Sequence, residues 1–399
     1  MRTARTGGTV SDETFGQALR RLRGTRSLRD VAHLASCGKS YVSDLEHERR
    51  QPTAAIAAAL DDALGGGGEL KMLAEAPPTA PLTAQAAALQ SGLLDAIAAG
   101  PMTDASVEDW EWTVARQGRA TRYRAEHDQL GELVGEFSDL QRVLARRHPA
   151  PVRRRLLVAA AGLSGLMALT LLKLGDDGAR SWWRTARTVA AAAEDRTIMS
   201  WLYAQEAYQL YYSHDLHGAI ELAVRAQHLA GGLPCVGPAL AAPLEARSHA
   251  RLGREDDVTS ALSRGQTALS RLDETDRAPS AFGYSESQLR FHSGNAWTHL
   301  GRTVAAREQH AQALALYPVD DHTDRALIGL DQAMCEALDG DAAAAAQQAA
   351  DTVLALPEEH RSPLIIYRAQ DVAARVPEAR SLPEGRVLRD VLALPAGEG

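Results

Sequence analysis

Five short turns recur at nearly constant intervals along the second half of the chain. They read LGDDGA, SHDLHGA, LGREDDV, LGRTVAA and DGDAAAA. Their anchor positions are Asp176, Asp215, Arg254, Arg302 and Asp341. Successive anchors are 39, 39, 48 and 39 residues apart, and a period in this range is typical of stacked helical hairpins. The repeat predicts an α-solenoid in which the extra residues around 273–284 form a loop on one face. An irregular helical bundle is the alternative.

The composition agrees with an all-α fold. Of the 399 residues, 45% are hydrophobic and only 5% are aromatic, and alanine and leucine dominate the apolar set. Because alanine, leucine, arginine and glutamate are among the best helix formers, we expect the folded part of the chain to be almost entirely helical. The length corresponds to two or three domains.

The sequence shows no pattern of catalytic or metal-binding residues. Cys37, Cys235 and Cys335 are far apart and no CxxC or Cys/His cluster occurs, so we predict neither a disulfide framework nor a zinc site. There is no P-loop, GxSxG or HExxH motif, and the glycines at 65–68 lack the Lys-Ser/Thr of a phosphate loop. We therefore expect no enzymatic activity, no cofactor and no metal.

One apolar run raises the question of a membrane. Residues 156–172 (LLVAAAGLSGLMALTLL) carry no charge and fall at the lower limit for a membrane span. A membrane tether is one interpretation. We favour a helix buried on all sides. Amphipathic hairpins follow it at the same spacing, and Gly162 and Gly165 allow close packing. The first thirty residues lack an apolar signal core. We expect a cytoplasmic protein without a membrane partner.

Positive charge is concentrated at the N-terminus. Residues 1–60 hold ten Lys or Arg against six Asp or Glu, whereas the whole chain has a net charge of −8. A basic head on an acidic body confines any attraction to phosphate groups to the head.

The head itself contains four short helical patterns over residues 13–64. Ser27 and Asp30 have the spacing of a capping box at the start of the second pattern. Small residues at Ala32 and Ala35 and a short turn at 36–38 let the second and third helices cross steeply, which places the third helix where it can enter a DNA major groove. The inward positions are Phe15, Leu19, Leu22, Leu28, Val31, Val42, Leu45, Ile56, Leu60 and Leu64.

The third helix, starting at Lys39 or Ser40, is the predicted recognition helix. Its outward positions are Lys39, Ser40, Ser43, Asp44 and His47. The N-terminal end of such a helix meets the base edges, where lysine can contact guanine and serine tolerates either base. Asp44 allows two interpretations: it accepts a hydrogen bond from cytosine, or it is simply solvated.

Residues around the third helix complete the expected interface. Arg29 suits a phosphate or a flanking base, and Arg49 and Arg50 suit backbone phosphates, which position the protein without specifying sequence. Glu46 is expected to pair with Arg20 or Arg23 and so to hold the third helix.

Residues 14–70 resemble the Cro/repressor-type (Xre) helix-turn-helix regulators, and most closely the actinobacterial group fused to a tetratricopeptide-like body. The matching head residues are Ser27-Leu28-Arg29, Lys39-Ser40-Tyr41, Ser43, Leu45-Glu46, Arg49-Arg50-Gln51-Pro52 and Gly67-Gly68-Glu69-Leu70. The body segments RSWWRTAR, FGYSESQLRFHSGNAWTHLG and ALALYP resemble the same group. One departure is Gly38, where the family usually has a serine or threonine whose hydroxyl often contacts phosphate.

The resemblance and the residue patterns together give the predicted sites and domains. The predicted DNA-binding residues are Ser27, Arg29, Lys39, Ser40, Tyr41, Ser43, Asp44, His47, Arg49 and Arg50. The predicted domains are a flexible arm (1–12), a helix-turn-helix domain (13–70), a linker (71–83), linking helices (84–150) and a TPR-like repeat body (151–399).

Aromatic residues crowd one region of the body. Trp201, Tyr208, Tyr211 and Tyr212 follow one helical face. They are candidates for a ligand groove, because aromatic walls are common in ligand pockets. Packing between repeats is the alternative, and the more frequent role of large aromatic residues at helical spacing.

We therefore expect a sequence-specific DNA-binding transcriptional regulator. A homodimer would place two recognition helices on an inverted repeat in double-stranded DNA. The body would mediate dimerisation, sense a peptide or small-molecule effector, or do both. The alternative is a protein-interaction adaptor whose head is vestigial.

Overall fold

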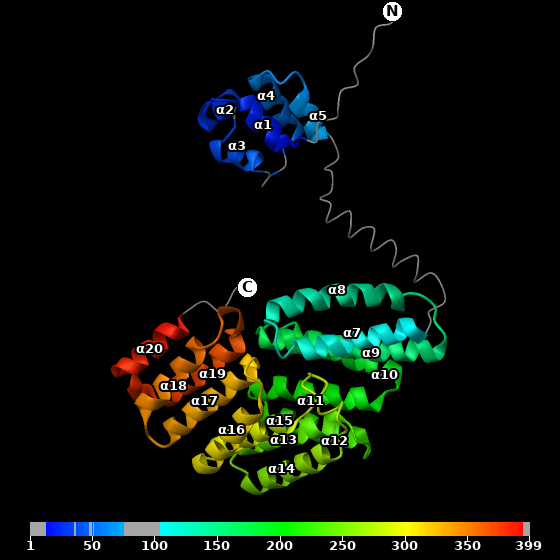
Figure 1. Ribbon diagram of the computed structural model, residues 1–399, viewed down its shortest axis with the longest axis vertical. Coiled ribbons are helices and arrows are strands. Elements are labelled where there is room, and N and C mark those ends of the chain that lie inside the picture. The colour runs from blue at the N-terminus through cyan, green and yellow to red at the C-terminus, as the bar shows by residue number, and fades with distance from the viewer. Residues whose placement is uncertain (1–12, 36, 48–49, 51, 76–103, 394–399) are drawn as a thin grey trace, which may run out of the picture. The chain divides into compact units, whose positions relative to one another are not determined.

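The protein folds into two compact helical units, spanning Met1–Leu94 and Asp95–Gly399 (Figure 1). The computed structural model describes residues 13–35, 37–47, 50, 52–75 and 104–393. The predicted arm over 1–12 lies outside these residues, as do 76–83 of the linker and 84–103 of the linking helices. We call the described helices of the first unit the head and those of the second unit the body, and we describe each by itself.

Five helices form the head. They are α1 (Phe15–Arg23), α2 (Leu28–Leu34), α3 (Lys39–Glu46), α4 (Ala54–Leu64) and α5 (Glu69–Glu75). The capping box predicted at Ser27 and Asp30 is confirmed, and Thr14 and Gln17 form a second one at α1. The core contains Leu19, Val31, Val42, Leu45 and Leu60, all buried, with the other predicted inward residues packed around them.

The linker expected over 71–83 begins too early, because residues 71–75 belong to α5. The cause is Asp61 of α4, which is buried and accepts hydrogen bonds from the amides of Gly68 (2.6 Å) and Leu70 (2.8 Å). These bonds satisfy amides at the start of α5, where a helix lacks internal partners. The glycine run is therefore a tight turn between two helices of the head.

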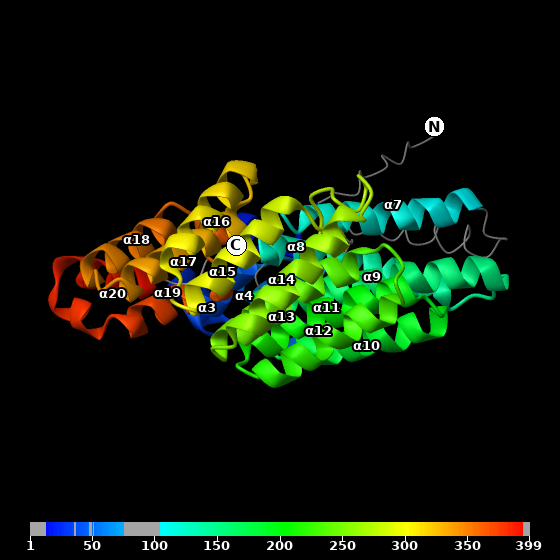
Figure 2. The same cartoon turned by 90° about the horizontal axis from the view of Figure 1, so that it is seen from below.

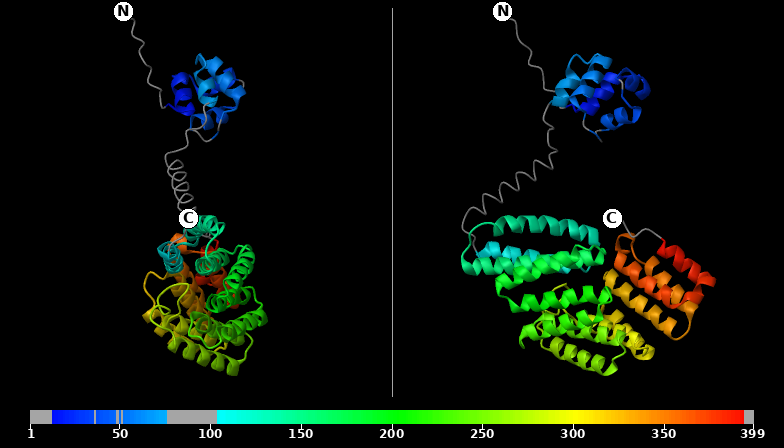
Figure 3. Two further views of the ribbon diagram at one scale, coloured as in Figure 1. Left: turned by 90° about the vertical axis from the view of Figure 1, so that its right-hand side faces the viewer. Right: turned by 180° about the vertical axis from the view of Figure 1, so that it is seen from behind.

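The body consists of helices packed in consecutive pairs, which confirms the predicted all-α solenoid (Figures 1 and 3). The pairs are α9 (Ala150–Lys173) with α10 (Ala179–Ala193), α11 (Arg196–Tyr212) with α12 (Leu216–Ala230), α13 (Val236–Arg251) with α14 (Glu255–Ser270), α15 (Glu286–His299) with α16 (Thr303–Leu316), α17 (His322–Leu338) with α18 (Ala342–Leu354), and α19 (Pro363–Arg375) with α20 (Pro383–Leu392). Short 3-10 turns, η1 (Glu358–His360) and η2 (Pro377–Ser381), flank α19.

The predicted turns are also confirmed. Asp215, Arg254, Arg302 and Asp341 are the residues that precede the second helices of their pairs. Asp176 lies in the turn before α10, where its carboxylate accepts from the amide of Gly178 at 2.7 Å. The linking helices α7 (Asp104–Ala120) and α8 (Glu126–Leu144) pack on α9 and so belong to the body, which begins before residue 151.

The body curves until its ends meet. The first helices of successive pairs contact one another from α9 through α19, and α19 in turn contacts α9 (Figures 1 and 2). The hydroxyl of Tyr367 in α19 lies 3.2 Å from Nε2 of His214, which follows α11. The first helices therefore surround a common interior.

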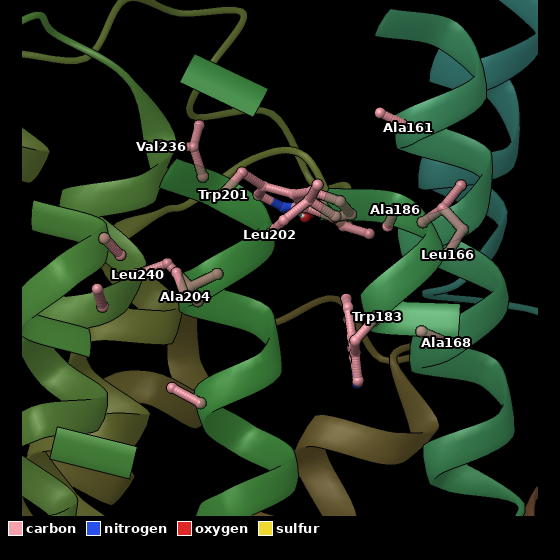
Figure 4. Close-up of a cluster of buried hydrophobic side chains, with 14 of the residues drawn as sticks. Ala161, Leu166, Ala168, Trp183, Ala186, Trp201, Leu202, Ala204, Val236 and Leu240 are labelled. Atoms are coloured by element: carbon pink, nitrogen blue, oxygen red, sulfur yellow. Dashed lines mark hydrogen bonds between the residues drawn. The ribbon is translucent and has the colours of Figure 1, made fainter. Parts of the chain in front are cut away.

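The apolar run at 156–172 is a core segment of α9. By length and composition this helix could cross a membrane, but two thirds of its most apolar window is buried inside the body. Figure 4 shows Leu166 and Ala168 of α9 beside Trp183 and Ala186 of α10, with Trp201 of α11 next to them. The burial predicted for the run is thus observed.

The insertion predicted around 273–284 is a loop that folds back into the body. The amide of Ala281 donates to the carbonyl of Gly118 in α7 at 2.8 Å. The carbonyl of Ala281 accepts from the indole nitrogen of Trp201 at 2.7 Å. Phe282 packs on the Trp201 ring, with 4.6 Å between the ring centroids. The loop therefore ties α7 to α11 across the interior.

Candidate nucleic-acid interface

The helix α3 has one buried side and one solvent side. Val42 and Leu45 are buried against the other helices of the head, whereas Lys39, Ser40 and His47 are exposed. Gly38 precedes the helix and supplies no side-chain cap. The predicted start of α3 at Lys39 or Ser40 is confirmed, and its predicted inward residues Val42 and Leu45 are buried, because apolar positions recur at helical spacing.

Glu46 fixes the end of α3 to α1. Its buried carboxylate pairs with Nε of Arg23 at 2.5 Å, and its carbonyl accepts from Arg20 at 2.9 Å. The hydrogen bond to Glu46 raises the pKa of Arg23. The predicted structural role of Glu46 is therefore confirmed. The ion pair holds α3 in a defined orientation, as direct contact with base edges requires.

Residues 14–73 match the sequence family described as a helix-turn-helix domain. The head is a helix-turn-helix domain. No curated protein matches the chain.

Within the helix-turn-helix domain, Asp44 has a partner that the sequence did not suggest. Its carboxylate lies 3.8 Å from Nε of Arg50, and the Arg50 guanidinium lies over the Tyr41 ring at 5.7 Å. Asp44 is therefore not simply solvated. It orients Arg50 beside the exposed end of α3, while Arg49 lies outside the described residues.

The other predicted contacts fall into two groups. Ser27 and His47 are used locally: the Ser27 hydroxyl accepts from the amide of Asp30, and Nδ1 of His47 lies 2.8 Å from the carbonyl of Ser43. Arg29 and Lys39 are exposed, and neither has a carboxylate partner among the described residues. Ser40 is exposed and Ser43 is half-buried.

Most of the remaining described cations of the helix-turn-helix domain form ion pairs with carboxylates. Arg21 pairs with Glu13 and Glu69, and Lys71 of α5 pairs with Asp62 of α4. Exposed ion pairs of this kind add little stability. They do neutralise charge away from α3. Among the described residues of the domain, Arg29 on α2 and Lys39 on α3 have no carboxylate partner, and Arg26, just before α2, donates only to the carbonyl of Ala63.

Of the aromatic residues proposed for a ligand groove, two are buried in the core and two line a cavity. Trp201 and Tyr211 are buried, and the Tyr211 hydroxyl donates to Oδ1 of Asn295 at 3.2 Å. Tyr208 and Tyr212 line a cavity of about 120 Å³ in the interior of the body. Arg247 lies in the same wall and was not predicted, although an arginine within the apolar run of α13 is visible in the sequence.

Proposed function

We propose that this protein is a sequence-specific transcriptional regulator of the Xre type, in which the head reads DNA and a TPR-like body supports dimerisation or effector sensing. The observation that carries the proposal is the exposed side of α3. Lys39 and Ser40 lie at its N-terminal end, which is the end that meets base edges in helix-turn-helix proteins.

The charges around α3 support the same role. Arg29 and Lys39 lack carboxylate partners among the described residues, and Arg50 is kept beside α3 by Asp44 and Tyr41. Cations free to meet phosphates give both affinity and steering toward DNA. We further propose that the protein acts in the cytoplasm, as a homodimer, without enzymatic activity.

Selection of DNA from a random pool by the full-length protein tests the proposal. We expect enrichment of an inverted repeat whose half-sites are about 34 Å apart, one helical turn, because each protomer of a dimer contributes one α3. Affinity should fall with salt by about 0.9 log units per log unit of salt for each neutralised phosphate.

The absence of any enriched sequence, with the head folded by circular dichroism and thermal melting, would contradict DNA reading. The alternative is then an interaction adaptor that uses the body alone. Enrichment of a single half-site would retain the DNA-reading role and reject the dimer.

A further inference from the structure

The interior of the body contains a small cavity of mixed character. It has a volume of about 120 Å³, and the first helices of the hairpins from α9 to α19 line it. Leu172, Leu240, Leu327 and Leu364 supply apolar wall. Because the drug-sized pockets of proteins occupy several hundred Å³, this cavity suits a smaller molecule.

Arg247 of α13 places a buried positive charge at this cavity. Its side chain is 1% exposed, and Nε donates to Oδ1 of Asn295 at 2.7 Å. The guanidinium lies over the Tyr211 ring at 4.6 Å and near the Tyr208 ring at 5.8 Å. Among the described residues this is its one hydrogen bond, so the two terminal nitrogens have no partner.

No carboxylate in the described part of the chain forms an ion pair with Arg247, although Asp331 stabilises its charge at longer range. The nearby Asp331 accepts from Asn295 and is ion-paired at 2.7 Å with Arg368, which also pairs with Asp371 at 3.1 Å. Asn295 therefore separates Arg247 from Asp331. A buried charge without a counter-ion is costly, and the aromatic rings offset only part of this cost.

The other cations of the cavity wall are already paired. Arg122 forms ion pairs with Asp324 and Asp321, and Lys173 lies 3.4 Å from Glu126. Burial, together with the Asp324 carboxylate, raises the pKa of Asp321 to about 7. The Arg122 cluster therefore has no surplus positive charge near neutral pH.

Neutral hydrogen-bonding groups surround Arg247. Tyr208 and Tyr284 place their hydroxyls 3.1 and 2.9 Å from the ring nitrogens of His292. Burial, and then the nearby Arg247 and Arg122, hold the pKa of His292 well below 6.5, so that its imidazole is neutral. The cavity thus presents one unpaired positive charge beside neutral polar groups and apolar walls.

We propose that this cavity binds a small monocarboxylate with an apolar body, whose carboxylate pairs with the terminal nitrogens of Arg247. The planar guanidinium matches a carboxylate in shape and in charge. A single unpaired cation favours a monoanion over a phosphate monoester, which carries close to two negative charges. This inference deepens the sensing role proposed for the body and rests on it.

Binding can be measured with two carboxylates and their matched neutral amides. The probes are hexanoate with hexanamide and phenylacetate with phenylacetamide, titrated calorimetrically into the full-length protein. We expect at least one acid to bind at least about tenfold more tightly than its amide, because only the acid makes a charge-assisted pair with Arg247. The same acid should raise the melting temperature of the body, since a ligand bound to the folded state stabilises it.

Arg247→Gln should remove this preference and leave amide binding unchanged. Arg251→Gln changes another arginine of α13 outside the cavity wall and should keep the preference. Equal binding of acid and amide, binding of neither pair, or full preference in Arg247→Gln would overturn the proposal. If Arg247→Gln does not fold, the comparison of acid with amide on the unaltered protein decides.

The experiment contains no DNA, so that its outcome is separable from that of the proposed function. Loss of acid binding with intact DNA selection would overturn this inference alone. Acid binding without DNA selection would reject the proposed regulator role but would still support the carboxylate site.

Discussion

The head and the body are both helical, but they differ in where their positively charged side chains without ion pairs lie. In the head, Arg29 and Lys39 are exposed on α2 and α3, and the buried Glu46 is covered by arginine. In the body, Arg247 is buried, has no ion pair among the described residues, and lines an interior cavity. The two proposed binding sites follow this difference: DNA on the surface of the head, and a small monocarboxylate within the curve of the body.

The two units also pack differently. The head joins short helices through polar links, such as Glu46 to Arg23 and Asp61 to the amides of α5. The body relies on small residues, so that helices approach closely over long stretches. Changes in charge should therefore affect the head most, and changes in volume should affect the body most.

The largest effect on stability is expected from Glu46→Ala. This variant removes the buried carboxylate that joins α3 to α1, and breaking such a pair costs about 3 kcal/mol. In chemical denaturation the head should unfold earlier while the body transition stays in place. Asp44→Ala on the same helix removes an exposed pair and should cost about 0–1 kcal/mol. Equal effects of the two variants would contradict the role given to Glu46.

Adding one methyl group at two different glycines should show where the helices of the body pack closely. A Cβ at position 165 would lie 2.4 Å from the Trp201 ring, which the insertion holds in place, so Gly165→Ala should destabilise the body by about 1–3 kcal/mol. Gly131 of α8 is exposed, with no atom near its absent Cβ. Gly131→Ala should instead stabilise the body by about 0.5–1 kcal/mol. Urea denaturation of both variants checks the signs, and a neutral Gly165→Ala would refute close packing there.

Acid should weaken the body through its buried histidines. His310 is fully buried, neither ring nitrogen has a partner in the described residues, and burial lowers its pKa below 6.5. Below pH 6.5 the unfolded chain binds a proton that the folded chain excludes, so this residue removes up to about 1.4 kcal/mol of stability per pH unit as the pH falls toward the folded-state pKa.

His310→Leu should therefore flatten the decrease of the body melting temperature between pH 7 and pH 5. The exposed His217→Leu in the same body is the control. An unchanged slope in His310→Leu would show that this histidine does not contribute to the acid sensitivity.

Local signals in the sequence were sufficient for much of the fold. The capping box at Ser27 and the turns at Asp215 and Asp341 depend on residues a few positions apart, and each was predicted. The pairing of Glu46 with Arg20 or Arg23 was also predicted, and Arg23 is the closer partner.

Features that depend on distant residues were not predicted. The start of α5 depends on Asp61, seven residues before Gly68. The cavity at Arg247 exists only because the hairpins curve and bring α11, α13 and α17 together. Periodicity shows which side of a helix is apolar, but it does not show how a stack of hairpins curves.

The most direct test of the account is the DNA preference of Lys39→Ala combined with Ser43→Ala. Fluorescence anisotropy would compare the selected duplex with a shuffled duplex of equal composition at one salt concentration. Lys71→Ala, whose lysine pairs with Asp62 away from α3, is the control. The account predicts that the double variant loses the preference, by about tenfold or more, while weak salt-dependent binding and the Lys71→Ala preference remain. An undiminished preference in the double variant would show that the exposed side of α3 does not read DNA.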